Sequence, residues 1–187
     1  SGQYAGGDLP GVREKMGYLQ DLGISSIWLS APYENRNAAG AAIDPGVDSN
    51  QYSAYHGYWP SPDNVDYSNP EGPQPRPQVE SRIGDDASLR GVVSDAHDAG
   101  IKVLFDYVMN HVDVNSGLYQ AHPEWFARGN GDDGTQAGEF ALCGGNGLNL
   151  WDHPYWSTRC AFTDYLPPFD LAEDAARAWS IADALWW

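Results

Sequence analysis

The sequence predicts an α/β fold in which helix-and-strand units alternate along the chain. Two stretches, residues 8–30 and 85–108, each combine an apolar helical stripe, a glycine that stops the helix and a short apolar strand. A third helix is expected to begin near Asp170, after a second long loop. Alternation of this kind gives parallel strands with right-handed crossovers, so the two strands should share one sheet.

The first unit is a helix followed by a buried strand over residues 24–29. Gly23 is a good stop signal between the two. Apolar residues recur at spacings of four, three and three positions, which places them on one helical face: Val12, Met16, Leu19 and Leu22.

The second unit repeats this plan. Asp85 or Asp86 is expected to cap the start of its helix and Gly100 to end it. Residues 101–108 follow as a strand rich in β-branched and aromatic side chains. The apolar stripe of the helix consists of Leu89, Val92, Val93 and Ala96.

The third helix is expected from Asp170 onward, with Glu173 at the spacing of a capping-box partner. Its apolar positions are Ala175, Trp179, Ala182 and Leu185. The sequence finishes in Ala-Leu-Trp-Trp, within this helix and before the strand that should follow. We therefore expect the sequence to be a piece of a larger protein.

Both long loops, residues 31–84 and 110–169, follow the carboxyl ends of the predicted strands. Connections in such folds are normally about 2 to 6 residues long, and longer ones usually carry function. In α/β sheets and barrels this end of the strands binds the ligand. The second loop is large enough for a small subdomain with its own aromatic cluster of Trp151, Tyr155, Trp156 and Phe162.

Composition excludes several classes of protein. Hydrophobic residues make up 42% and aromatic residues 13% of the 187 positions, which is typical of a globular protein and not of a disordered one. The formal net charge of −16 repels phosphate, so nucleic acid and anionic membranes are not expected partners. A neutral substrate or a cation fits better. Adaptation to high salt and an ordinary acidic secreted protein both remain open readings of this charge.

Two cysteines, Cys143 and Cys160, bracket a loop-rich stretch. One pair does not make a zinc framework. A disulfide between them would close a loop worth about 3 kcal/mol in the chain-entropy model, and two buried free thiols are the alternative. A disulfide would indicate an oxidising compartment, so an extracellular or periplasmic location is expected. No leader segment and no apolar run of membrane-spanning length is visible.

Two short motifs carry the predicted chemistry. The first, Asp106-Tyr107-Val108-Met109-Asn110-His111, ends the second strand. Asp106 is either a buried carboxylate that accepts backbone N–H groups or a polar group directed into a site. The Asn110 carbonyl suits a hard cation such as calcium, and His111 can donate to a neutral hydroxyl.

The second motif is Tyr55-His56-Gly57-Tyr58-Trp59-Pro60 in the first long loop. Its aromatic faces suit the apolar faces of pyranose rings, and Gly57 allows a sharp backbone turn. Packing of a loop beneath its own aromatic side chains is the alternative.

Together these motifs resemble the signatures of the α-amylase family, glycoside hydrolase family 13. The first is similar to the family's Asp-x-Val-x-Asn-His signature, and Tyr55 to Trp59 resembles its Tyr-His-Gly-Tyr-Trp loop. Leu166-Pro167-Pro168-Phe169-Asp170 resembles its Leu-Pro-Asp-Leu-Asp signature. The resemblance implies a partial (β/α)8 TIM barrel around strands two and three, with an inserted, loop-rich domain B. Barrel residues 1–111, domain B residues 112–169 and a return helix at 170–187 are the expected divisions.

The resemblance also implies roles at a sugar site. Tyr58 would stack on the sugar beside the scissile bond, and Trp59 would support this aromatic wall. His56 and His111 would hydrogen-bond the hydroxyl groups of the sugar. Asp106 would support the region of the nucleophile without being the nucleophile itself.

A calcium ion is implied as well, with Asn110 as a ligand between barrel and domain B. Gly7-Asp8 resembles the last part of a second calcium loop, which makes Asp8 a further candidate ligand. Pro168 stands where the family usually has a ligating aspartate, and it offers no side-chain donor. Asp164 or Asp170 is the expected substitute.

The resemblance places the three catalytic carboxylates on later barrel strands than those seen here. Retaining glycoside hydrolysis needs two carboxyl groups about 5 to 5.5 Å apart, which Asp106 alone does not supply. We therefore expect an α-1,4-glucan hydrolase acting on starch or maltodextrins, of which this chain is an inactive N-terminal portion. The complementary C-terminal part is the expected protein partner. A cyclodextrin glycosyltransferase-type transglycosylase and a non-catalytic glucan-binding module are the alternatives.

Overall fold

The structure, a computed structural model, describes residues 4, 6–36, 54–62, 65–66, 72–145 and 147–187. The chain forms two compact units: residues 1–58 with 78–107, and residues 59–77 with 108–187. The domain boundaries expected from the sequence stay predictions.

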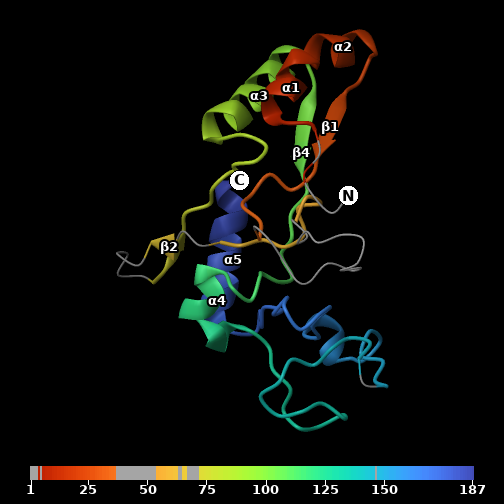
Figure 1. The fold of residues 1–187 in the computed structure, drawn as a ribbon, viewed down its shortest axis with the longest axis vertical. Coiled ribbons are helices and arrows are strands. Elements are labelled where there is room, and N and C mark those ends of the chain that lie inside the picture. Colours follow the sequence, from red (N-terminus) through yellow and green to blue (C-terminus); the bar gives the residue numbers. More distant parts are fainter. Residues whose placement is uncertain (1–3, 5, 37–53, 63–64, 67–71, 146) are drawn as a thin grey trace, which may run out of the picture. The chain divides into compact units, whose positions relative to one another are not determined.

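The first unit is a parallel pair of strands with helices packed beside it (Figure 1). Ser26 lies opposite Lys102 and Leu29 opposite Phe105, and α3 (Asp86–Asp98) contacts both β4 (Lys102–Phe105) and α1 (Leu9–Glu14). The parallel helix-and-strand arrangement predicted from the sequence is confirmed. The elements of this unit are α1 (Leu9–Glu14), α2 (Met16–Asp21), β1 (Ser26–Leu29), α3 (Asp86–Asp98) and β4 (Lys102–Phe105).

Helix α3 begins where its capping residue predicts. The Asp85 carboxylate accepts the Ser88 backbone N–H at 2.8 Å, and the Ser88 hydroxyl oxygen accepts the Asp85 N–H at 2.7 Å. Reciprocal bonds of this kind satisfy donors that the first helical turn leaves unpaired. The single helix predicted upstream is instead divided at Lys15 into α1 and α2, and Leu22 at its end is 61% exposed.

Both strands are shorter than the sequence predicts, and one face of the pair is exposed. β1 begins at Ser26 and β4 ends at Phe105. Trp28 and its register partner Leu104 are 75% and 53% exposed within the part of the chain that the structure describes. Successive side chains of a strand point to opposite faces, and Ile27 on the other face is partly buried. The strand predicted to be buried over residues 24–29 is therefore only partly buried among the described residues.

The second unit contains most of the loop-rich sequence. α5 begins at Asp174, not near Asp170, because Asp170 instead closes a turn through its bond from the Ala172 N–H. Leu185, predicted in its apolar stripe, is 82% exposed. The elements are β2 (Val65–Asp66), β3 (Gln74–Pro75), α4 (Gly117–Ala121), η1 (Pro123–Trp125), η2 (Trp156–Thr158) and α5 (Asp174–Trp186).

Two hydrophobic clusters hold this second unit together. The larger joins α4, η1 and α5 through residues that include Leu118, Phe126 and Trp179. The smaller surrounds a disulfide between Cys143 and Cys160, whose Cα atoms are 4.9 Å apart. Of the helices in the described ranges, none combines the length and hydropathy needed to cross a membrane.

Candidate functional site

The carboxyl end of β4 in the first unit carries Asp106. Its backbone N–H donates to the Leu29 carbonyl at 3.0 Å, which continues the parallel pairing with β1 beyond Phe105. The Tyr58 hydroxyl donates to the Asp106 carboxylate at 2.7 Å. This bond favours the neutral phenol and raises the pKa of Tyr58. The Asp106 carboxylate therefore contacts the aromatic loop, and its role at a sugar site stays a prediction.

His56 lies beside Tyr58 and is held by the same loop. The Tyr58 backbone N–H donates to His56 Nδ1 at 3.0 Å, so Nδ1 is an acceptor and the proton of the neutral ring resides on Nε2. The two rings are nearly parallel, with centroids 5.6 Å apart and an interplanar angle of 19°. Burial lowers the pKa of His56, which keeps the ring neutral.

The loop that presents these rings makes a tight turn at Gly57, where φ is 82°. A Cβ at this position would lie 3.0 Å from the Ala31 Cβ, so the turn requires glycine for space as well as for conformation. The Ala54 carbonyl accepts both the Gly57 N–H at 2.8 Å and the Tyr4 hydroxyl at 3.1 Å.

An ion pair between buried Glu80 and partly exposed Arg82 lies next to Tyr4 in the first unit. Glu80 is 2% exposed and accepts hydrogen bonds from Arg82 Nε at 2.7 Å and from the Asn35 N–H at 3.0 Å. Burial alone would raise the pKa of Glu80, but the bonds from Arg82 and Asn35 outweigh it and hold that pKa below its ordinary value. The Arg82 guanidinium lies over the Tyr4 ring at 4.3 Å, and burial raises the pKa of Tyr4 to about 12.

His111 and Asn110 belong to the second unit. His111 is 5% exposed and forms a β-bridge with Pro168, and the Phe169 N–H donates to the Asn110 carbonyl at 2.9 Å. The Asn110 carboxamide nitrogen lies 3.2 Å from His111 Nδ1. The end of the Asp106–His111 motif and the Leu166–Asp170 segment, which resemble two of the family signatures, therefore lie side by side in this unit.

Trp59 and Tyr165 form an edge-to-face pair in the second unit, with centroids 5.5 Å apart. The structure thus groups Tyr58 with Asp106 and His56, Asn110 with His111, and Trp59 with Tyr165. These groups stand in separate units, the first in one and the other two in the other.

The candidate calcium ligands do not form a cluster of acidic side chains in the described residues. Asp8 caps α1 by accepting the Gly11 N–H at 2.7 Å, and Asp170 lies 3.3 Å from Arg159 Nε. Across the described ranges, no three His, Cys, Asp or Glu side chains gather closely enough to hold a metal ion. Calcium takes about six to eight oxygen ligands. Pro168 leaves Asn110 without the partner that the family signature would supply.

Residues that the motifs did not single out also matter. Tyr4, Glu80 and Arg82 brace the first unit, and no local sequence signal marks them as a network. The aromatic cluster that the sequence did indicate divides in the structure. Trp156 is fully buried, whereas Trp151 and Phe162 are about half exposed.

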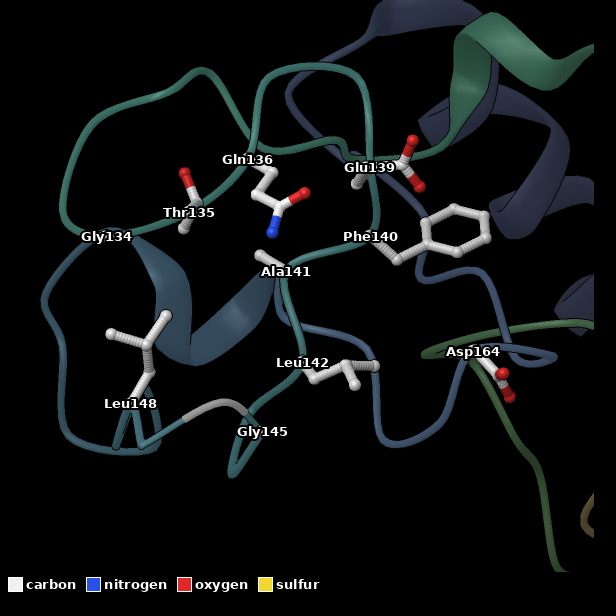
Figure 2. Close-up of a pocket in the computed structure, with 10 residues that line it drawn as sticks. All are labelled: Gly134, Thr135, Gln136, Glu139, Phe140, Ala141, Leu142, Gly145, Leu148 and Asp164. Atoms are coloured by element: carbon white, nitrogen blue, oxygen red, sulfur yellow. The ribbon is translucent and has the colours of Figure 1, made fainter.

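A pocket in the second unit is lined by Asp164, one of the candidate calcium ligands, and by none of the predicted sugar-binding residues (Figure 2). Gln136, Glu139 and Asp164 contribute its polar groups, and Leu142 and Leu148 are among its apolar walls. Phe140 also lines it, with the Arg128 guanidinium 4.0 Å from its ring.

Enzymes with an α/β barrel build their sites at the carboxyl ends of the parallel strands, and Asp106 with its hydrogen-bonded partner Tyr58 lies at such a strand end. A family model described as the catalytic domain of alpha amylase matches residues 1–136. The chain belongs to this family.

Curated relatives match this chain over part of their own length. The chain is 39% identical to the periplasmic alpha-amylase of Escherichia coli (strain K12) over 110 residues, or 59% of this chain and 14% of the relative. It is 30% identical to the cyclomaltodextrin glucanotransferase of Bacillus sp. (strain 1-1) over 176 residues, or 91% of this chain and 21% of the relative.

Solved structures share the fold over nearly the whole chain. The alpha-amylase from Geobacillus thermoleovorans, complexed with acarbose, gives a TM-score of 0.63 at 24% identity, over 97% of this chain and 31% of that one. An Anoxybacillus alpha-amylase gives a TM-score of 0.67 at 22% identity, over 99% of this chain and 31% of that one. The fold is thus that of part of an alpha-amylase-type barrel.

Proposed function

We propose that this chain is the N-terminal, sugar-binding portion of a retaining α-amylase-type glycoside hydrolase that acts on α-1,4-glucans such as starch and maltodextrins. The observation that carries this proposal is the 2.7 Å hydrogen bond from the Tyr58 hydroxyl to Asp106 at the end of β4. It fixes an exposed aromatic ring beside a carboxylate, where a barrel enzyme receives its substrate.

Each group then has a chemical task. The Tyr58 ring, 46% exposed, stacks on the apolar face of a glucose ring. His56 carries its proton on Nε2, because Nδ1 accepts a backbone N–H, and this suits a neutral sugar hydroxyl as acceptor. In the second unit, we assign to His111 a hydrogen bond to a sugar hydroxyl and to Trp59, which packs against Tyr165, a supporting aromatic role.

Bond cleavage is assigned elsewhere in the enzyme. Retaining hydrolysis uses one carboxylate as nucleophile and a second carboxylic acid as proton donor. The Asp106 carboxylate is engaged by the Tyr58 phenol, so we assign it to positioning and not to attack on the sugar. We accordingly propose that the complementary C-terminal part of the same enzyme provides the catalytic carboxylates.

A transglycosylase is the second candidate. It is favoured by a curated match to a cyclomaltodextrin glucanotransferase that covers 91% of this chain. The products that the enzyme carrying this chain forms from starch distinguish the two. Linear oligosaccharides support a hydrolase, and cyclic glucans support the transglycosylase.

We also propose that the protein works outside the cytoplasm, in the medium or the periplasm. The disulfide between Cys143 and Cys160 supports this, since such bonds persist in oxidising compartments.

Calorimetric titration of the 187-residue chain with maltoheptaose tests the sugar-binding role. Tyr58→Ala should weaken binding about tenfold or more, because the stacking ring is lost. Tyr58→Phe should lose less, since only the bond to Asp106 disappears. Tyr18→Ala removes a comparably exposed tyrosine from α2 of the same unit and should bind as the unmodified chain does.

Equal binding by Tyr58→Ala and the unmodified chain would overturn the proposal. Release of reducing sugar from starch by the purified chain would contradict the assignment of catalysis to other parts of the enzyme. A non-catalytic glucan-binding module is supported instead if the protein that carries this chain binds maltoheptaose but leaves starch intact.

A further inference from the structure

Three aromatic side chains of the second unit lie in a row that begins at His111. The Phe162 ring meets His111 edge to face, with centroids 5.4 Å apart, and Trp151 adjoins Phe162 at 5.4 Å with planes inclined by 31°. His111 is buried, whereas Trp151 and Phe162 are 53% and 50% exposed. Two large rings therefore stay in contact with water beside an imidazole already assigned to sugar binding.

We infer that Trp151 and Phe162 form a further glucose-binding subsite next to His111, within the second unit. This inference rests on the proposed function. The ligand is a neutral pyranose of an α-1,4-glucan, whose C–H face packs on the two rings. The strongly negative charge of the chain disfavours an anionic ligand at the same place.

Backbone hydrogen bonds to residues 141–143 hold the chain next to both rings. Phe162 follows Ala161, which bridges Leu142 and donates its N–H to the Ala141 carbonyl at 2.8 Å. Trp151 follows Leu150, whose N–H donates to the Cys143 carbonyl at 2.8 Å. The disulfide closes this arrangement, so little conformational entropy is lost when a sugar binds.

The Tyr155 ring is exposed to a similar degree, but neighbouring side chains pack on it. It is 47% exposed, but the Arg159 guanidinium lies 4.4 Å from its ring centroid, and Trp156 packs edge-on against it. Among the described residues, no arginine covers the ring of Trp151 or Phe162. Tyr155, Trp151 and Phe162 are thus similarly exposed, but only Trp151 and Phe162 present a ring face that a sugar can pack on.

Titration with maltoheptaose tests this inference on the 187-residue chain. Trp151→Ala and Phe162→Ala should each weaken binding about five- to thirtyfold. The ring-retaining variants Trp151→Phe and Phe162→Tyr should keep most of the affinity. Tyr155→Ala is the matched control from the same unit and should bind as the unmodified chain does. Near-ultraviolet circular dichroism confirms that each variant is folded.

The outcomes separate this inference from the proposed function. If Tyr58→Ala weakens binding but the Trp151 and Phe162 alanine variants do not, the subsite is refuted and the proposed function stands. If Tyr155→Ala weakens binding as much as they do, or if the ring-retaining variants bind no better than alanine, the subsite is also refuted. If the unmodified chain does not bind maltoheptaose, both proposals fail.

Discussion

His56 and Tyr58 depend on each other through a backbone bond that exists only while the imidazole is neutral. The Tyr58 N–H donates to His56 Nδ1, and a protonated Nδ1 has no lone pair to accept it. Burial already lowers the pKa of His56. Protonation of His56 therefore loosens the loop that positions the stacking ring of Tyr58.

This coupling predicts an acid-sensitive contribution to stability. Because the pKa of folded His56 is depressed, the stabilisation is present above the ordinary histidine value of about 6.5 and is lost as pH falls toward the folded value. Urea unfolding at pH 7.5 and 5.5 measures it. The unmodified chain should lose more free energy of unfolding on acidification than His56→Gln does. An equal loss in both proteins would show that His56 titrates alike in the folded and unfolded states.

The pair of buried Glu80 with partly exposed Arg82 predicts a large effect of a single substitution. Glu80→Ala removes the carboxylate that Arg82 and the Asn35 N–H bind, which should lower the free energy of unfolding by about 2 to 4 kcal/mol. Arg13→Ala is the control, because the Arg13–Asp95 pair is exposed and pairs of this kind contribute little to stability. Urea denaturation of both variants checks this, and similar losses would contradict the importance of burial.

At the scale of elements, the turn at Gly57 links backbone conformation to sugar binding. Gly57→Ala meets both a positive φ and the Ala31 Cβ at 3.0 Å, whereas Gly23→Ala meets only a positive φ of 78° with open space. Gly23→Ala should cost about 1 kcal/mol of stability. Gly57→Ala should cost more and should also weaken maltoheptaose binding, because Tyr58 is displaced. Thermal unfolding and titration of the two variants distinguish strain from steric conflict, and unaltered binding by Gly57→Ala would contradict the displacement.

Capping chemistry made some elements predictable and others not. α3 could be predicted because Asp85 and Gly100 are local signals at its two ends. The predicted start of α5 at Asp170 was wrong, since this aspartate makes a turn and an ion pair with Arg159. Periodicity also placed Leu22 and Leu185 in apolar stripes, although tertiary packing leaves both exposed.

The site was predictable to the extent that its residues follow one another along the chain. Tyr58, His56 and Asp106 lie in short motifs beside predicted strand ends, so their grouping in the first unit could be anticipated. Phe162 and Trp151 were visible only as part of an aromatic cluster. The packing around the disulfide decides which of these aromatic residues are buried. In an irregular loop, no local sequence pattern predicts that packing.

At the scale of the whole molecule, the net charge of −16 predicts a dependence of stability on salt. Like charges repel more strongly in the compact state than in the unfolded chain, and salt screens this repulsion over about 10 Å at 0.1 M and 3 Å at 1 M. The midpoint of thermal unfolding should rise between 0.05 and about 1 M NaCl. Sucrose at equal osmolality is a control for solvent exclusion, and a midpoint that falls in salt would contradict the prediction.

The exposed apolar side chains of Trp28 and Leu104 affect how readily copies of the chain associate in solution. Within the described ranges, β1 and β4 pair only with each other, so apolar side chains stand next to open strand edges. In dilute buffer, mutual repulsion between highly anionic copies keeps such surfaces apart. Salt that strengthens each folded molecule also shortens the range of that repulsion, so concentrated stocks of the isolated polypeptide should stay clearest at low ionic strength.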